Sequence, residues 1–175
     1  ALNNLENYIS EHNEGNGVLR ERQATVFDDL RKFIEAGKKR GKVILPTGVG
    51  KTVLFTEFTK ALDLPTLIVV PTQILVNQTG DKIDQFAPDM EYGKVYADAK
   101  QHGRPVTIIT YDSLVSGLKS GSIKPEDYKA LILDEAHESL TVARQQAISQ
   151  FENQSVILEF TATDKYSESK KLTSE

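Results

Sequence analysis

Residues 43–52 read Val-Ile-Leu-Pro-Thr-Gly-Val-Gly-Lys-Thr, and this stretch decides the fold class. A short apolar run typical of a β-strand ends at Leu45, a loop with two glycines follows, and a helical stretch begins near Lys51. Glycines let such a loop turn tightly enough to aim its N–H groups at phosphate oxygens, and the helix N-terminus adds partial positive charge. Strand, loop and helix in this order predict a phosphate-binding loop in an α/β domain.

The chemistry expected of this loop is the binding of ATP together with Mg²⁺. Lys51 would reach the β- and γ-phosphates, and the Thr52 hydroxyl would bind the Mg²⁺ that bridges them. The generic pattern has glycine where this chain has Leu45, so a glycine-rich turn with an incidental Lys-Thr pair is the alternative. The predicted nucleotide-binding residues of the loop are Thr47, Gly48, Val49, Gly50, Lys51 and Thr52.

Short apolar runs alternate with helical stretches along the rest of the chain. Several runs are continuously apolar, as expected when helices cover both faces of a parallel sheet. We therefore predict a doubly wound, mostly parallel sheet flanked by helices, with ligands bound beyond the carboxyl ends of the strands. The predicted strands are Val43–Leu45, Thr66–Val70, Lys94–Tyr96, Val106–Thr110, Ala130–Leu133 and Val156–Phe160.

The two ends of the chain differ from this alternating middle part. We expect a small helix over residues 2–12, a turn up to residue 17, and an amphipathic helix over residues 23–36 that stops at Gly37. The polar residues 164–175 indicate a frayed tail or a link. Residues 18–163 would then form the ATP-binding domain, and residues 1–17 a separate N-terminal helix and turn.

The composition is that of one globular domain, with 175 residues, 39% hydrophobic and 26% charged. Cysteine is absent, and no apolar run is long enough to cross a bilayer, so we expect no membrane partner and a cytoplasmic protein. The net charge of −4 gives no overall attraction for nucleic acid, so any such binding must rest on local groups. The basic residues between 38 and 42 are interpreted as a solvated loop.

Two adjacent carboxylates follow the predicted strand at Ala130–Leu133, where the chain reads Asp134-Glu135-Ala136-His137. Unpaired charge is costly at the end of a buried strand, and a divalent metal removes that cost. Asp134 would hold Mg²⁺, and Glu135 would orient and deprotonate the attacking water. The alternative is an acidic pair that caps the next helix, with His137 on the surface.

Together the two motifs resemble the first ATPase domain of superfamily 2 helicases and translocases, a RecA-like domain. Residues 134–137 match the DEAH form of motif II, and residues 45–52 resemble motif I of this superfamily. Gln23 is similar to the upstream element that recognises adenine, since a carboxamide can donate to one adenine edge atom and accept from another. A polar residue at the start of an amphipathic helix is the alternative for Gln23.

Three further segments follow predicted strands and resemble family motifs in the family's order. For two of them the resemblance implies contacts to a nucleic-acid backbone, and helix capping by Thr72 or Ser113 is the alternative. Thr161 and Thr163 resemble motif III, which, with His137 of motif II, would couple ATP state to nucleic-acid binding; Asp164 replaces the usual proline. The implied nucleic-acid contacts are Pro71, Thr72, Gln78, Thr110, Asp112 and Ser113.

The resemblance implies the ATP-binding half of a nucleic-acid-dependent ATPase, of a restriction-translocase or excision-repair type, with DNA favoured over RNA. Its partner would be a second RecA-like domain of a longer protein, so we expect these residues alone to hydrolyse ATP weakly. The alternatives are an RNA helicase and a phosphate-loop ATPase that acts on another substrate. A non-catalytic module or a kinase would not need Lys51, Thr52, Asp134 and Glu135 together.

Overall fold

The computed structural model describes residues 21–37, 39–45, 51–97, 99–135, 141–162 and 172–174. The helix expected over residues 2–12 lies outside these ranges. The helices are α2 (Glu21–Glu35), α3 (Lys51–Leu62), α4 (Gln73–Phe86), α5 (Tyr111–Ser120), the short 3₁₀ helix η1 (Pro125–Asp127) and α7 (Val142–Ser149). The strands are β1 (Arg40–Leu45), β2 (Thr66–Val70), β3 (Tyr92–Tyr96), β4 (Ala99–Lys100), β5 (Val106–Thr110), β6 (Ala130–Asp134), β7 (Val156–Ala162) and β8 (Leu172–Ser174).

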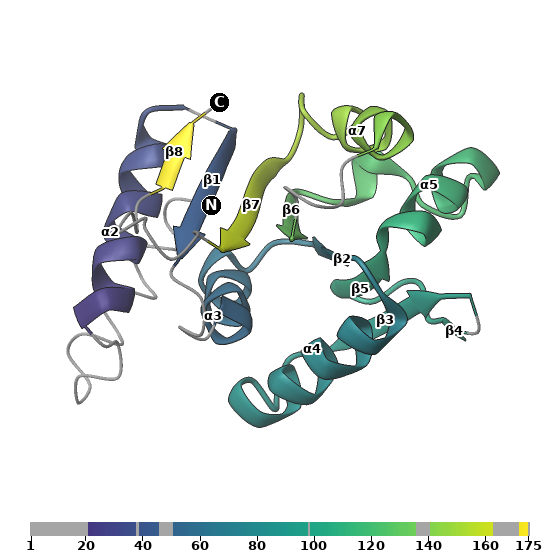
Figure 1. Cartoon of the computed structure of the whole chain (residues 1–175), viewed down its shortest axis with the longest axis horizontal. Coiled ribbons are helices and arrows are strands. Elements are labelled where there is room, and N and C mark those ends of the chain that lie inside the picture. The colour runs from purple at the N-terminus through teal and green to yellow at the C-terminus, as the bar shows by residue number, and fades with distance from the viewer. Residues whose placement is uncertain are drawn as a thin grey trace.

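One sheet organises the described residues, with strand order β4-β3-β5-β2-β6-β7-β1-β8 (Figure 1). The strands from β3 to β1 in this order pair in parallel, whereas β4 and β8 pair antiparallel at the two edges. Helices cover both faces, with α3 and α4 on one side and α5 and α7 on the other (Figure 1). The predicted doubly wound, mostly parallel sheet is therefore confirmed.

All six predicted strands are present, and the helix predicted over residues 23–36 is α2. Gly37 follows α2 with a φ of 74°, a left-handed conformation that suits glycine at a helix end. The sequence did not predict β8, because the polar tail was expected to fray. Residues 172–174 instead pair with Gly41–Val43 of β1, so that expectation is wrong for these three residues.

The basic residues near the start of β1 are only partly the solvated loop that we expected. Lys39 is exposed, and its ammonium donates to the Asn153 carbonyl at 2.9 Å. Arg40, by contrast, belongs to β1 and forms ion pairs with Glu159 at 2.7 Å and with Glu152 at 3.0 Å. Glu159 is only 2% exposed, so its carboxylate needs such a partner. The role of Arg40 is therefore structural.

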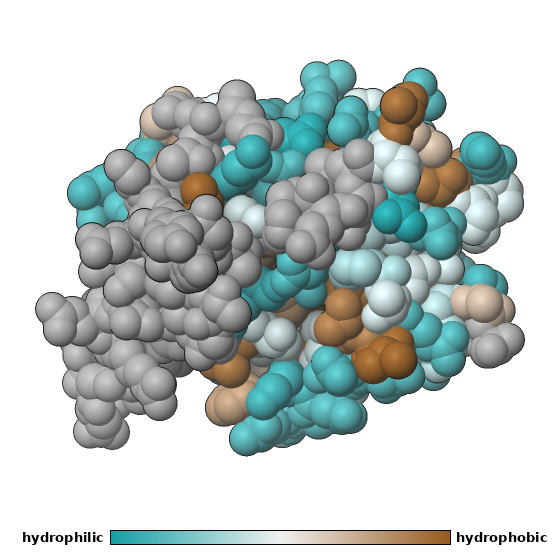
Figure 2. Space-filling view, viewed as in Figure 1, coloured by the Kyte–Doolittle hydropathy of each residue, from teal (hydrophilic) through white to brown (hydrophobic). Residues whose placement is uncertain are grey.

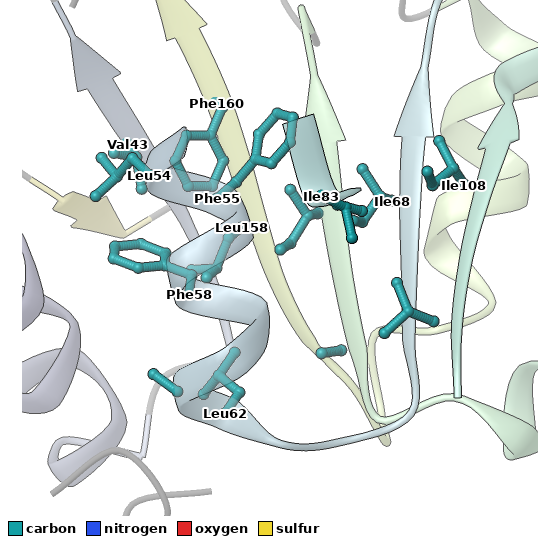
Figure 3. Close-up of a cluster of buried hydrophobic side chains, with 14 of the residues drawn as sticks. Val43, Leu54, Phe55, Phe58, Leu62, Ile68, Ile83, Ile108, Leu158 and Phe160 are labelled. Carbon is teal, nitrogen blue, oxygen red and sulfur yellow. The ribbon is translucent and has the colours of Figure 1, made fainter. Parts of the chain in front are cut away.

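Two apolar clusters fill the space between the sheet and its helices. Figure 3 shows the one beneath α3, where Phe55 and Phe58 point toward Phe160 of β7. Both rings meet Phe160 edge-on, with centroids 5.6 and 5.5 Å apart. Such aromatic pairs are favourable beyond the area they bury, so they fix α3 against β7. The cluster on the opposite face packs α5 and α7 against β2, β5, β6 and β7.

On the face shown in Figure 2, the described residues present mostly hydrophilic side chains, and apolar side chains gather in small separate patches. Among the described residues, the large apolar side chains that are exposed are Ile74 at 69% and Val142 at 72%. Within the same ranges, no helix combines the length and the apolar character needed to cross a bilayer.

Gly93 in β3 lies where a side chain would disrupt the edge of the sheet. A Cβ atom there would overlap the carbonyl oxygen of Gln101, whose own N–H donates to the Lys94 carbonyl at 3.0 Å. We expect Gly93→Ala to lower the free energy of unfolding by about 1–3 kcal/mol, because the backbone must shift to make room. Urea unfolding followed by circular dichroism measures this change.

Gly80→Ala is the matched control. Its Cβ would approach side-chain atoms only, the flexible end of Lys94 and, at 3.2 Å, the Tyr92 hydroxyl, and alanine is favoured over glycine inside α4 by up to about 1 kcal/mol. Equal destabilisation by both substitutions would contradict the backbone overlap at Gly93.

Candidate active site

The carboxyl ends of the parallel strands bring the predicted site residues to one edge of the sheet. β1 leads toward Lys51 at the start of α3, β6 ends at Asp134, and Thr161 lies near the end of β7. In the strand order, β7 lies between β1 and β6. The strands that lead to Lys51 and to the acidic pair at the end of β6 are thus not neighbours in the sheet.

Lys51 contacts both predicted catalytic carboxylates. Its Nζ lies 2.6 Å from Oδ1 of Asp134 and donates a hydrogen bond to Oε1 of Glu135. The Asp134 side chain is 4% exposed, whereas those of Lys51 and Glu135 are 21% and 26% exposed. Lys51 and the acidic pair, which lie far apart in the sequence, are thus in direct contact.

Burial and the ion pairs act in opposite directions on these groups. Burial by itself would lower the pKa of Lys51, but the bonds to Asp134 and Glu135 outweigh it, and the pKa is raised. Burial raises the pKa of Asp134, and the Lys51 ammonium opposes this only in part. Lys51 therefore stays positively charged, and Asp134 is a buried carboxylate that depends on a nearby cation.

The backbone at Glu135 has an unusual conformation. Its φ is 54°, in the left-handed region that residues with a side chain rarely occupy, and its N–H donates to the Phe160 carbonyl at 3.1 Å. The turn after β6 is thereby attached to β7. Strained backbone of this kind is concentrated at functional sites, where it aims a side chain.

Sequence reasoning missed Tyr111, which contacts the acidic pair, and Arg144, which packs on Tyr111. Tyr111 is fully buried, and its hydroxyl donates to the backbone carbonyl of Asp134 at 2.9 Å. The Arg144 guanidinium lies 5.4 Å from the centre of the Tyr111 ring and donates to Asp112 at 3.0 Å. The signal in the sequence was an aromatic residue directly after a strand, within a segment already assigned to nucleic-acid binding.

The residues predicted to contact nucleic acid follow β2 and β5 at the same edge. Thr72 caps α4 by accepting from the Leu75 N–H, as the alternative interpretation proposed. At α5 the capping residue is Thr110, which accepts from the Ser113 N–H, so capping by Ser113 is wrong. Thr72, Gln78 and Asp112 are exposed, Pro71 is half-buried, and Thr110 and Ser113 are buried.

The structure covers the remaining predicted site residues only in part. Gln23 is in the first turn of α2, but its side chain is not described. Thr52 is next to Lys51 in the first turn of α3, and Thr161 is half-buried in β7. The residues that fall outside the described ranges are Thr47, Gly48, Val49, Gly50, His137 and Thr163.

The oxygen atoms near Lys51 suit a hard divalent cation. Oδ1 of Asp134 is buried and, in the described part of the chain, has no hydrogen bond of good geometry, although the Lys51 ammonium is close to it. Glu135 adds a second carboxylate, and Thr52 adds a hydroxyl one residue after Lys51. Mg²⁺ prefers such oxygen ligands, so these residues fit the predicted ion.

A protein-family model matches residues 16–165, which is most of the chain. Its description is "Type III restriction enzyme, res subunit". The chain belongs to this family. The match includes the residues that form the contact between Lys51 and the acidic pair, together with the segments after β2 and β5.

The curated relatives of this family member are much longer than the chain. It is 34% identical over 100 residues to the DNA 3'-5' translocase XPB2 of Sulfurisphaera tokodaii, which covers 57% of the chain and 22% of the translocase. It is 29% identical over 120 residues to the putative ATP-dependent RNA helicase QP509L of African swine fever virus, covering 66% of the chain and 23% of that helicase. The chain thus spans less than a quarter of each relative.

Solved structures share the fold of this family member. A hypothetical ATP-dependent RNA helicase from Sulfolobus tokodaii superimposes with a TM-score of 0.67 at 22% identity, covering 92% of the chain and 50% of the helicase. The SWI2/SNF2 ATPase core of Sulfolobus solfataricus, solved with double-stranded DNA, gives a TM-score of 0.63 at 20% identity. This match covers 83% of the chain and 32% of the ATPase core. At these identities the likeness concerns the fold, which is that of a RecA-like helicase domain.

Proposed function

We propose that the chain is the ATP-binding half of a nucleic-acid-dependent ATPase, a DNA helicase or translocase that couples ATP hydrolysis to movement. The observation that carries this proposal is the contact of Lys51 with both Asp134 and Glu135 at the carboxyl edge of a parallel sheet. A cation for phosphates, an acidic ligand for a metal and a potential base are thereby gathered at one point. Family membership and the helicase and translocase relatives support the same conclusion.

In this site each residue has a separate role. Lys51 binds the β- and γ-phosphates, and Glu135 orients the attacking water and takes its proton. Thr52 and Asp134 hold Mg²⁺, which neutralises developing charge on the phosphates when it is bound. The raised pKa of Lys51 keeps its charge available at neutral pH. Gln23 completes the nucleotide site by contacting the adenine, and residues 47–50 complete it by contacting the phosphates.

Nucleic acid binds, in this proposal, along the edge formed by the segments after β2 and β5. The exposed Thr72 and Gln78 contact the sugar-phosphate backbone directly, whereas the buried Thr110 and Ser113 act by presenting the N-terminus of α5. Pro71 and Asp112 shape the same edge. These contacts are independent of base sequence, as movement along a polymer requires.

DNA is favoured as the polymer because the relative with 34% identity is a DNA translocase, although other relatives are putative RNA helicases. The motif I sequence supports the restriction-translocase or excision-repair branch, and residues 134–137 the DEAH form of motif II. His137, Thr161 and Thr163 couple the ATP state to the polymer. A second RecA-like domain completes the site, so residues 1–175 alone hydrolyse ATP weakly.

The full-length protein is expected to hydrolyse ATP faster when DNA is present than when it is absent. The measurement is phosphate release with no polymer, single-stranded DNA, duplex DNA and RNA, all at one salt concentration because phosphate contacts are salt-dependent. Stronger stimulation by RNA than by DNA would support the RNA helicase alternative. ATP hydrolysis that no polymer stimulates would favour an ATPase acting on another kind of substrate.

A further inference from the structure

Tyr111 connects the predicted nucleic-acid edge with the catalytic turn. It is the first residue of α5, directly after Thr110, and is fully buried. Its hydroxyl donates to the backbone carbonyl of Asp134, the last residue of β6, at 2.9 Å. This bond holds the backbone one residue before the left-handed turn at Glu135.

Arg144 extends the connection to the surface. Its guanidinium lies over the Tyr111 ring at 5.4 Å and donates to Asp112 at 3.0 Å. The Asp112 side chain is 85% exposed, whereas that of Arg144 is only 21% exposed. A continuous series of contacts therefore runs from Asp112 through Arg144, Tyr111 and Asp134 to Lys51.

We propose that Tyr111 and Arg144 are positioning residues for ATP hydrolysis. Tyr111 fixes the backbone that aims the Glu135 side chain. Arg144 links the position of this backbone to Asp112, which lies at the predicted nucleic-acid edge. This inference rests on the proposed function, since it assigns the coupling between polymer and ATP to specific contacts. Tyr111 contacts the backbone of Asp134, and Arg144 contacts Tyr111, so both would act through the turn after β6.

The environment of the Tyr111 hydroxyl favours its role as a hydrogen-bond donor. Burial, followed by the nearby carboxylates of Asp134 and Glu159, raises its pKa well above the ordinary value. The phenol donates to the Asp134 carbonyl at 2.9 Å, and this bond carries the proposed role. The Glu135 N–H is bonded to β7 on the other side, and loss of the Tyr111 bond removes one of the restraints on the turn.

The first test is Tyr111→Phe in the full-length protein, which removes only the hydroxyl. We expect kcat for ATP to fall about 10-fold, the rate equivalent of roughly one hydrogen bond. Affinity for a non-hydrolysable ATP analogue should stay within about twofold, because Lys51 keeps its charge and its neighbours. A merely structural role would lower both quantities together through loss of folded protein.

Tyr128→Phe is the matched control. Tyr128 is 7% exposed and belongs to the same apolar cluster as Tyr111, but it precedes β6, whereas Asp134 ends that strand. We expect wild-type kcat from this variant. An unchanged kcat in Tyr111→Phe, or an equal loss in both variants, would overturn the role of the Tyr111 hydroxyl.

The second test is Arg144→Gln, with Lys119→Gln on the exposed side of α5 as a control for loss of one positive charge. We expect the ratio of DNA-stimulated to unstimulated kcat to fall about 5-fold in Arg144→Gln and to remain unchanged in Lys119→Gln. An unchanged ratio in Arg144→Gln overturns the coupling. Absence of DNA-stimulated ATPase activity in the wild-type protein would instead overturn the proposed function itself.

Discussion

Replacement of Lys51 by alanine is expected to lower the ATPase rate of the full-length protein by at least about 100-fold, and to weaken ATP binding as well. Removal of a single preorganised charged group from a phosphoryl-transfer or acyl-transfer site has effects of this size. In Lys51→Ala the buried Asp134 also loses the cation that lies 2.6 Å from it, so two adjacent carboxylates would repel the triphosphate. Phosphate release and titration with a fluorescent ATP analogue measure the two effects.

Lys60→Ala provides the control on the same helix. Lys60 lies in the last turn of α3, at the opposite end of the helix from Lys51, and forms a long, half-buried ion pair with Glu57 at 3.7 Å. We expect this variant to bind and hydrolyse ATP like the wild type. Retention of ATP affinity in Lys51→Ala would show that the contact with Asp134 and Glu135 has only a structural purpose.

Glu135→Gln is expected to separate ATP binding from ATP hydrolysis. The amide has the same shape but cannot take a proton from water, so we expect the hydrolysis rate to fall about 10²- to 10⁴-fold. Nucleotide affinity should be equal or higher, because one negative charge near the phosphates is removed. Single-turnover hydrolysis and equilibrium binding of ATP distinguish these two quantities.

Glu126→Gln is the corresponding control, since it makes the same chemical change on the exposed η1 helix that precedes β6. Its activity should equal that of the wild type. If Glu135→Gln hydrolysed ATP at more than about a tenth of the wild-type rate, another group would have to serve as the base.

The fold was predictable from the sequence where each strand carries its own apolar pattern. The continuously apolar runs of β2 and β6 are buried along their whole length, and both were predicted within one residue of their ends. The edge strands β4 and β8 were missed because they consist of two and three residues with little apolar character. β8 forms by pairing with the distant strand β1, and such pairing leaves no local signal, whereas β4 pairs locally with β3 but is too short to carry an alternating pattern.

The candidate site was likewise only partly predictable from the sequence. Lys51, Asp134 and Glu135 were predicted because each belongs to a short motif at a strand end, and the structure brings these three residues into contact. The placement of Tyr111 under Arg144 was not predictable, since these residues come from different helices, α5 and α7. Arg40 was misinterpreted for a related reason, because its buried partner Glu159 belongs to another strand.

At position 135 the residue that would best stabilise the fold differs from the residue that the proposed chemistry needs. At a φ of 54° glycine would be more stable than any residue with a side chain, by roughly 1 kcal/mol or more. A search for thermostable variants that ignored activity would therefore select glycine at position 135 and discard the proposed base. Glutamate at this position carries a conformational cost. Selection for ATP hydrolysis and selection for folding stability therefore favour different residues here.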